Sequence, residues 1–300
     1  MTAQSRPIAL RVRGRDLPLG QRTYIMGIIN VTPDSFSGDG ILAGPGAPVA
    51  RAVRQALEMV DEGADMLDVG AESTRPGHEP VDEAEERRRV VDVVAAIRET
   101  LPSVPISIDT RKAVVAEAAI GAGADIVNDV AGVTAGAALA PVAAAHAVPY
   151  IIMHARHRPA DGDIVAGVVA ELRDALELAQ QAGCAADALI VDPGIGFGKT
   201  TEQNLALLRG LRNLRQLGRA VLLGASRKST IGRVLELPVD ERLEGTLATT
   251  ALGIAAGIDI VRVHDVAANV RVARVSDAIV RGGWRDAGER PGARGTRERP

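Results

Sequence analysis

The sequence predicts a single (β/α)8 barrel (a TIM barrel) with a short N-terminal β-hairpin, and two observations support this fold class. A short apolar run rich in Ile and Val, followed by an amphipathic or Ala-rich helical stretch, occurs eight times along the chain. The runs are nearly continuous, as expected for parallel strands of which both faces are covered and neither faces water. Eight such units in about 250 residues are typical of the barrel. An open doubly wound sheet is the alternative fold, but the count of eight and the missing dinucleotide fingerprint favour the barrel.

Each unit contributes one expected strand and one expected helix. The strands are expected at residues 24–30, 65–70, 104–109, 125–130, 148–154, 188–192, 220–226 and 258–264. The helices are expected at residues 48–62, 82–100, 111–122, 137–146, 164–183, 202–217, 241–256 and 266–281. The chain therefore divides into an N-terminal hairpin segment (1–23), a barrel domain (24–283) and a tail (284–300).

The two segments outside the barrel have different compositions. Residues 8–22 alternate between apolar and polar side chains, which predicts a small hairpin that closes the bottom of the barrel. Residues 284–300 are rich in Arg, Gly and Pro and have almost nothing to bury, so we expect them to be disordered.

Composition excludes several classes of protein. The 300 residues are 46% hydrophobic and 24% charged, which suits a chain with a large core. A formal net charge of -3 gives no sign of nucleic-acid binding. No apolar run is long enough for a secretion signal or for a membrane span. Cys184 is the only cysteine, which excludes an intramolecular disulfide and fits a reducing compartment, so we expect a cytoplasmic protein.

The segment DPGIGFGKTT (192–201) looks like a phosphate-binding loop but does not fit one. A P-loop needs glycine five positions before the Gly-Lys pair, and Pro193 stands there instead. We expect Asp192 to end the sixth strand and to point into the barrel mouth, with Phe197 beside a flat bound ring. Lys199, one of only three lysines in the chain, is then a support for the loop or a neighbour of the site, and not a phosphate ligand.

Polar residues at the ends of the predicted strands form two chemical sets. The active site of a barrel of this kind lies where strands end and βα loops begin. One set suits a flat heterocycle with several N–H groups, such as a 2-amino-4-oxo pyrimidine ring; it consists of Asp109, Asn128, Asp192 and Lys228. The other set suits phosphate or pyrophosphate; it consists of Arg75, Arg262 and His264, with Asn30 and Ser226 as neutral partners.

Two long loops, 30–48 and 71–80, are rich in Gly, Pro and Ser and are expected to act as lids over the mouth. Asp34 and Phe36 would bring a carboxylate and a ring to the site when the first loop closes. His154 and His157 lack the spacing and the third ligand of a zinc site. Lys228 leaves open an alternative, Schiff-base chemistry at a strand end.

Seven motifs resemble the dihydropteroate synthase family, the sulfonamide-target enzymes of folate biosynthesis. They are MGIINVTPDSFS (26–37), GADMLDVGAESTRPG (63–77), SIDT (107–110), ND (128–129), DPGIGFGK (192–199), GASRKS (224–229) and RVHDV (262–266). The match covers nearly the whole barrel in order. It implies a magnesium-dependent homodimer that condenses 6-hydroxymethyl-7,8-dihydropterin pyrophosphate with 4-aminobenzoate and releases pyrophosphate by an SN1-like displacement.

The resemblance also implies a role for individual residues. The pterin would be held by Asp109, Asn128, Met153, Asp192, Phe197, Gly224 and Lys228. The pyrophosphate would be held by Asn30, Arg75, Arg262 and His264, and magnesium by Asn30 and Asp34. The aminobenzoate would contact Phe36, Thr74, Pro76, Ser226 and Lys228. The catalytic residues would be Asp109, Lys228, Arg262 and His264.

Three loops depart from the family pattern, and two other functions remain open. The chain has SFSGDG for the usual SFSDGG, AES for GES, and ARHRPADGD after His154 in place of M-x-G-x-P-x-x-M. A pterin-dependent methyltransferase on the same fold would need the ring pocket without the anion-binding set. A catalytically silent relative would bind a pterin or a partner only. Pyrophosphate release separates these alternatives from the synthase.

Overall fold

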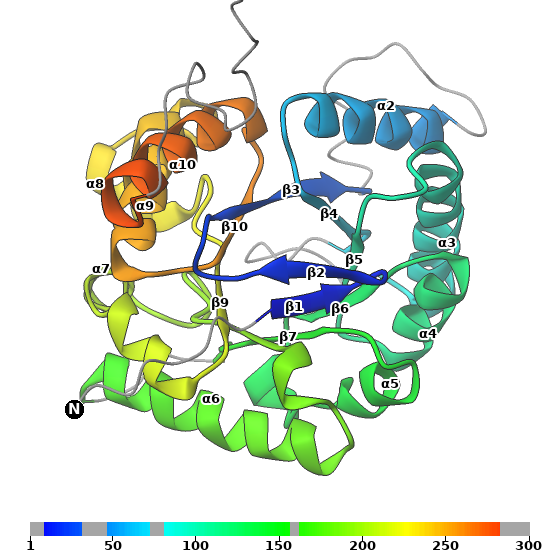
Figure 1. Cartoon of the computed structure of the whole chain (residues 1–300), viewed down its shortest axis with the longest axis horizontal. Coiled ribbons are helices and arrows are strands. Elements are labelled where there is room, and N and C mark those ends of the chain that lie inside the picture. Colours follow the sequence, from blue (N-terminus) through cyan, green and yellow to red (C-terminus); the bar gives the residue numbers. More distant parts are fainter. Residues whose placement is uncertain (1–8, 32–46, 73–80, 157–161, 283–300) are drawn as a thin grey trace, which may run out of the picture.

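The computed structural model describes residues 9–31, 47–72, 81–156 and 162–282, and these residues form a closed barrel of eight parallel strands (Figure 1). The strands are hydrogen-bonded in the order β10-β3-β4-β5-β6-β7-β8-β9. Their bounds are β3 Tyr24–Asn30, β4 Met66–Gly70, β5 Ile106–Thr110, β6 Ile126–Asp129, β7 Tyr150–Met153, β8 Leu189–Asp192, β9 Ala220–Leu223 and β10 Ile260–Val263. The predicted (β/α)8 fold class is confirmed.

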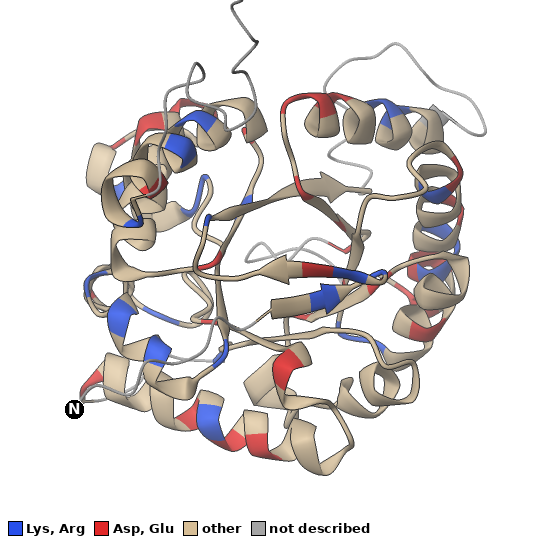
Figure 2. Cartoon of the chain, in the orientation of Figure 1, with Lys and Arg blue, Asp and Glu red and all other residues tan. Residues whose placement is uncertain are grey.

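Helices surround the barrel and carry much of its charge (Figure 2). The α-helices are α2 Ala47–Asp61, α3 Glu83–Thr100, α4 Ala113–Ala122, α5 Ala140–Ala145, α6 Ile164–Gln181, α7 Thr201–Arg209, α8 Ser229–Leu235, α9 Leu243–Ala256 and α10 Val266–Val280. The described residues also form short 3-10 helices, which are η1 Gly132–Ala135, η2 Ala186–Ala188, η3 Leu211–Leu217 and η4 Val239–Glu241. Within the described residues, no helix is both long enough and apolar enough to cross a membrane.

Two helix predictions need correction. The helix expected at 202–217 is divided into α7 and η3 at Gly210, where an added Cβ would lie 2.6 Å from Val165 of α6. The close approach of α6 therefore excludes a side chain at this position. Helix α8 was not expected, because its seven residues lie between a predicted strand and a predicted helix. It ends at Leu235, and the next residue, Glu236, has a left-handed backbone with φ of 57°.

Side-chain capping sets where several helices begin. The Asp82 carboxylate accepts a hydrogen bond from the Ala84 N–H at the start of α3, and Asp163 does the same for Val165 and Ala166 at the start of α6. At α7, Thr200 and Gln203 form a capping box. These side chains satisfy N–H groups that have no partner inside the helix. The βα loops, which border the barrel mouth, therefore end at defined positions.

The strands separate two apolar clusters. One fills the space between the sheet and the helices, and the other fills the barrel interior. Interior residues include Met66, Ile126, Ile190 and Ile260. Side chains on a strand alternate between its two faces, so the residue two positions later faces the same side. On these four strands that residue is Asp68, Asn128, Asp192 and Arg262, respectively. A polar layer thus lies directly above the apolar interior, at the carboxyl ends of the strands.

The predicted N-terminal hairpin is present and closes the opposite end of the barrel. Strands β1 (Ala9–Val12) and β2 (Arg15–Pro18) pair in antiparallel fashion. Leu10 and Val12, which are at most 1% exposed, belong to the interior cluster. The hairpin therefore supplies the lowest apolar layer of the barrel. Residues 1–8 lie outside the described residues. The tail at 284–300, which was predicted to be disordered, also lies outside them.

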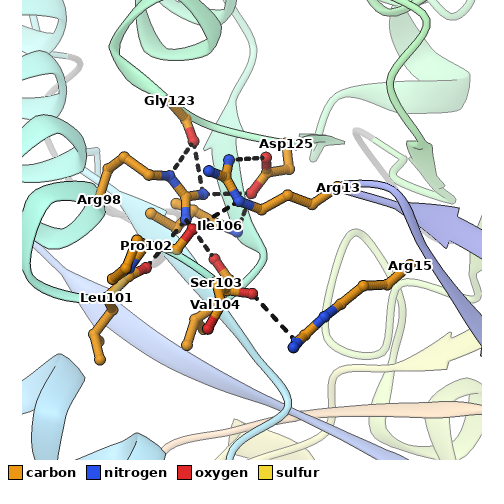
Figure 3. Close-up of polar contacts among 10 residues, drawn as sticks. All are labelled: Arg13, Arg15, Arg98, Leu101, Pro102, Ser103, Val104, Ile106, Gly123 and Asp125. Carbon is orange, nitrogen blue, oxygen red and sulfur yellow. Dashed lines mark hydrogen bonds and ion pairs between the residues drawn. The ribbon is translucent and has the colours of Figure 1, made fainter.

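Arginines hold the hairpin to the bottom of the barrel (Figure 3). Arg13 at the hairpin turn donates to the Asp125 carboxylate at 3.0 Å and to the Pro102 carbonyl at 2.9 Å. Arg98 of α3 binds the other Asp125 oxygen at 2.5 Å and also donates to the carbonyl of Gly123. One carboxylate therefore joins the hairpin, α3 and the start of β6.

We expect Leu10→Ala to lower the free energy of unfolding by about 2–5 kcal/mol, because it opens a cavity in the barrel interior. Urea denaturation measures this change. Arg11→Ala, at the exposed position next along β1, serves as the control and is expected to change stability by less than about 0.5 kcal/mol. Equal effects of the two substitutions would contradict the role of the hairpin as part of the core.

Candidate active site

The centre of the barrel mouth is an ion-paired cluster that joins strands across the barrel. Arg262 of β10 donates from Nε to Asp68 Oδ2 and from Nη2 to Asp109 Oδ2, each at 2.6 Å. Asn128 of β6 donates to the two carboxylate oxygens of Asp68 at 3.3 and 3.2 Å. Asp68 is fully buried. Charge-assisted hydrogen bonds of this length are the strong ones, so the four side chains hold each other in place.

A cavity opens directly above this cluster. It is lined by Asp109, Asn128, Val130, Met153, Asp192, Phe197, Gly224, Lys228 and Arg262. All seven residues of the predicted pterin set are among them, together with Val130 and Arg262, which the sequence did not assign to this set. An added Cβ on Gly224 would lie 3.4 Å from Asp192 Oδ2, so glycine leaves room beside this carboxylate. Lys228 Nζ lies 4.0 Å from the centroid of the Phe197 ring, a cation–π contact.

Burial changes the ionisation of the cavity groups. It raises the pKa of Asp192, and it raises the pKa of Asp109 to about 7 against the opposing effect of Arg262. It lowers the pKa of Lys228 to about 8, and the positive charge of Arg262 adds to this effect. Burial also lowers the pKa of Arg262, but the carboxylates of Asp68 and Asp109 more than reverse this, so Arg262 stays charged. The cavity therefore offers buried acceptors beside fixed cations, a setting that suits a polar heterocycle.

The loops after β9 and β10 are joined to each other. Ser226 Oγ lies 3.0 Å from His264 Nδ1, and it accepts the backbone N–H of His264 at 3.2 Å. Arg227 has φ of 56°, an unusual backbone for a residue other than glycine. Its guanidinium pairs with both oxygens of Asp265, and its backbone N–H donates to Thr246 Oγ1 at 3.0 Å. These contacts hold Ser226 and Lys228, which flank Arg227, at the barrel mouth.

His264 is a neutral imidazole in this environment. Burial, together with the charges of Arg262 and Arg227, lowers its pKa to about 3. His264 was grouped with cations in the sequence, but here it offers hydrogen bonds without a positive charge. Asn30 ends β3 and pairs in register with Gly70 at the same end of the barrel. The predicted site residues Asp34, Phe36, Thr74, Arg75 and Pro76, and most of both expected lid loops, lie outside the described residues.

The His154 ring does not line the cavity and pairs instead with a residue of α6. It is fully buried, and its Nε2 lies 3.1 Å from Glu171 Oε2 of α6. Burial lowers the pKa of His154 to about 3. Within the described part of the chain, no three His, Cys, Asp or Glu side chains are grouped so as to hold a metal ion. His157 lies outside the described residues.

Asp68 is a member of the Arg262 cluster for which no role was predicted from the sequence. Its signal was present, since MLDVG is an apolar strand with one carboxylate at an inward-facing position. What the sequence could not show is the partner, because Arg262 follows 194 residues later. Val130 was missed for a different reason: it lies just beyond β6 and is an ordinary apolar side chain.

Comparisons with known proteins agree with this geometry. Residues 26–264 match the family model described as pterin binding enzyme. The chain is 48% identical over 273 residues to the dihydropteroate synthase of Clostridium beijerinckii, covering 91% of this chain and 100% of that protein. A structure of dihydropteroate synthase from Clostridium difficile in the presence of pteroic acid has a TM-score of 0.83 and 48% identity, covering 88% and 98% of the two chains. The enzyme from Xanthomonas albilineans with 4-aminobenzoic acid has a TM-score of 0.85 and 39% identity, covering 91% and 98%.

The chain is a pterin-binding enzyme of the (β/α)8 type. This class follows from the family match, the eight-stranded barrel and the polar cavity at the carboxyl ends of the strands. Within that class the chain belongs to the dihydropteroate synthase family.

We expect Asp68→Asn to lower the free energy of unfolding by about 1.5–3 kcal/mol, because Arg262 loses a charged hydrogen-bond acceptor in a buried site. Urea denaturation measures this loss. The same substitution at Asp61, an exposed carboxylate at the end of α2, is the matched control and is expected to be nearly neutral. If the two variants unfold at the same urea concentration, the Asp68 pair contributes nothing to the stability of the mouth.

Proposed function

We propose that this protein condenses 6-hydroxymethyl-7,8-dihydropterin pyrophosphate with 4-aminobenzoate to give 7,8-dihydropteroate and pyrophosphate in folate biosynthesis. The observation that carries the proposal is the cavity, because one space brings together all seven predicted pterin residues over the Arg262 cluster. The related enzymes bind pteroic acid and 4-aminobenzoic acid, according to the structures described above.

The cavity groups match the hydrogen-bonding pattern of a pterin ring. Asp192 and Asn128 would take its N–H groups, while Lys228 would donate to a ring acceptor. Asp192 Oδ1 already accepts the Gly194 N–H at 2.7 Å, which leaves Oδ2 turned toward the space beside Gly224. Phe197 would cover one face of the ring. A site built to pair with several substrate N–H groups discriminates strongly against rings that lack them.

The same residues support an SN1-like displacement. When pyrophosphate leaves, positive charge develops on the pterin and its exocyclic carbon. Asp109 lies at the cavity wall, and its carboxylate would stabilise that charge through space. The leaving group gains negative charge, which hydrogen bonds from His264 and Ser226 at the rim would stabilise. The aromatic amine is neutral at pH 7, so its nitrogen attacks the carbon without prior removal of a proton.

Magnesium is part of the proposal, and Asn30 would hold it. The donor set fits, because a side-chain amide oxygen at the mouth is a hard ligand and Mg²⁺ usually keeps several waters and substrate phosphates as its other ligands. Asp34, the second proposed ligand, lies outside the described residues. When bound, magnesium would neutralise charge on the pyrophosphate. Omitting magnesium from the assay below is expected to lower the rate of pyrophosphate release.

We expect the purified protein to release pyrophosphate from the pterin substrate only when 4-aminobenzoate is present. Arg262→Ala and Asp192→Asn are each expected to lower turnover at least tenfold, a loss of ~1.4 kcal/mol of transition-state stabilisation. Asp61→Asn is the control with unchanged turnover. Near-normal turnover in both site variants would contradict the assignment of the site. Pterin binding by calorimetry without pyrophosphate release would favour a silent relative.

We also propose a homodimer that forms through α9 and α10. The three most exposed large apolar side chains of the described residues are Ile279 (78%), Leu252 (70%) and Val275 (62%), and all lie on these two helices. The helices pack against each other beside the barrel (Figure 1). Exposed apolar groups gathered on neighbouring elements are typical of association surfaces.

Sedimentation is expected to show a dimer for the wild type and a monomer for Leu252→Glu, because a buried carboxylate destabilises an apolar interface. Leu178→Glu, at an apolar position that is 45% exposed on α6, is the matched control and should remain dimeric. A Leu252→Glu variant that stays dimeric would place the interface elsewhere.

We propose a cytoplasmic location for the protein. The single cysteine, Cys184, is buried and has no disulfide partner, as is usual for proteins of reducing compartments. Cell fractionation tests this, and recovery of the protein outside the cytoplasmic fraction would contradict it.

A further inference from the structure

Lys199 is a lysine whose three N–H groups all bind backbone carbonyls. Its Nζ donates to the carbonyl of Gly194 at 2.8 Å, of His154 at 2.9 Å and of Phe197 at 3.1 Å. An ammonium group has three donors, so its hydrogen-bonding capacity is used completely. Among the ion pairs of the described residues, none involves Lys199. The charge is therefore stabilised by peptide dipoles and not by a contacting carboxylate.

The three carbonyls belong to two loops that pack backbone against backbone. Gly194 has φ of 64°, and an added Cβ there would lie 1.9 Å from the His154 carbonyl oxygen. Gly198 has φ of 60°, and its added Cβ would lie 1.9 Å from the carbonyl oxygen of Arg156. Side chains at these positions would separate the loops. The loop between β8 and α7 thus lies directly on the chain that leaves β7, and Lys199 joins the two where they meet.

The same contacts determine where the Phe197 ring lies. The Phe197 N–H donates to the Gly194 carbonyl at 3.1 Å and closes a turn. Lys199 then binds the carbonyls at both ends of that turn. The Phe197 side chain lines the cavity and contacts Lys228. Lys199 is absent from the cavity wall.

We infer that Lys199 is a positioning residue for the pterin pocket: it ties the β8–α7 loop to the end of β7 and thereby holds the Phe197 ring against the bound pterin. The inference rests on the proposed pterin-binding function. Lys199 acts through Phe197 and does not touch the substrate.

The charged form of Lys199 is the one that holds the turn. The pKa of Lys199 is lowered to about 7, mainly by burial. Asp192 of β8 raises this pKa, while Arg156 and Lys228 on the neighbouring loops lower it. The third contact comes from the His154 backbone, while the neutral His154 ring pairs with Glu171. A neutral amine has two N–H groups, so one carbonyl loses its donor as pH rises above about 7. The contribution of Lys199 is therefore complete at acid pH and decreases with increasing pH.

A double-mutant cycle tests this assignment. Calorimetry with 6-hydroxymethylpterin at pH 6.5 gives the dissociation constants of the wild type, Lys199→Met, Phe197→Ala and the double variant. We expect Lys199→Met to weaken binding about tenfold, and the double variant to bind no more weakly than Phe197→Ala alone, because coupled residues are not additive. The dissociation constant of Lys199→Met divided by that of the wild type should be smaller at pH 8.5 than at pH 6.5. Additive effects, or a ratio that is the same at both pH values, would overturn the inference.

Lys112 provides the matched control. It is also a partly buried lysine, and it donates to the Val81 carbonyl at 2.6 Å and to carboxylates of Glu72 and Glu86. The effect of Lys112→Met on pterin binding is expected to be the same with and without Phe197→Ala. If Lys199→Met does not fold, Lys199→Gln takes its place, since the amide can donate two hydrogen bonds without a buried charge.

Hydrogen exchange separates this inference from the proposed function. In the folded protein without ligand, Lys199→Met is expected to speed exchange in the peptide 193–200 at least tenfold, while Lys112→Met leaves it unchanged. Unchanged exchange in the Lys199 variant would overturn the inference whether or not the protein binds a pterin. A wild type that shows no pterin binding, with faster exchange in the variant, would contradict the proposed function alone.

Discussion

Arg262 makes the barrel mouth a single unit, because its guanidinium binds Asp68 and Asp109 on two other strands at the same time. Removing either carboxylate would leave part of a buried cation without a partner, which is strongly unfavourable. Arg262 also influences the charge of the neighbouring groups. Burial raises the pKa of Asp109 and Arg262 opposes this rise, whereas burial lowers the pKa of Lys228 and Arg262 lowers it too. The charges that line the cavity and the stability of the mouth thus depend on the same side chain.

The barrel geometry explains why these groups meet. Alternation along parallel strands places Asp68, Asn128, Asp192 and Arg262 in one layer, directly above an apolar layer to which Met66 and Ile260 belong. The apolar layer is closed from below by Leu10 and Val12 of the hairpin. The polar groups are therefore surrounded by apolar side chains below and by the strands at the sides. This low-polarity environment strengthens each charge–charge contact in the site.

Among the described residues, two pairs of loops support the site by similar means. After β9 and β10, Arg227 and Asp265 hold Ser226 and Lys228 near His264. After β7 and β8, Lys199 joins the carbonyls of His154, Gly194 and Phe197. In both pairs, a cation that is not part of the cavity wall holds a side chain of that wall in place. Such support restricts the motion of these side chains, which lowers the entropy cost of ordering them when a ligand binds.

Much of the fold and of the pocket could be predicted from local patterns. Eight apolar runs, each followed by a helical stretch, were enough for the barrel, and strand ends indicated Asp109, Asn128, Asp192 and Lys228. Element bounds were less certain where a tertiary contact decides them. Gly210 is itself a local signal for a helix end, but the close approach of Val165 of α6, which leaves no room for a side chain there, could not be read from neighbouring residues. The short helix α8 was missed because seven residues give too little periodicity.

The sequence by itself determined the order of strands and helices, the kinds of side chain at each strand end and the turns that glycines permit. These are local properties, read from neighbours along the chain. The tertiary structure decided which of those side chains touch. The sequence indicated Arg262 as a polar group of the mouth but not its pairing with Asp68 and Asp109, and it indicated Lys199 as a loop support but not the three carbonyls that Lys199 binds. Asp68, Asp109 and the His154 carbonyl lie on other strands and loops and are brought near only when the barrel closes, because closure places all eight strand ends around one axis.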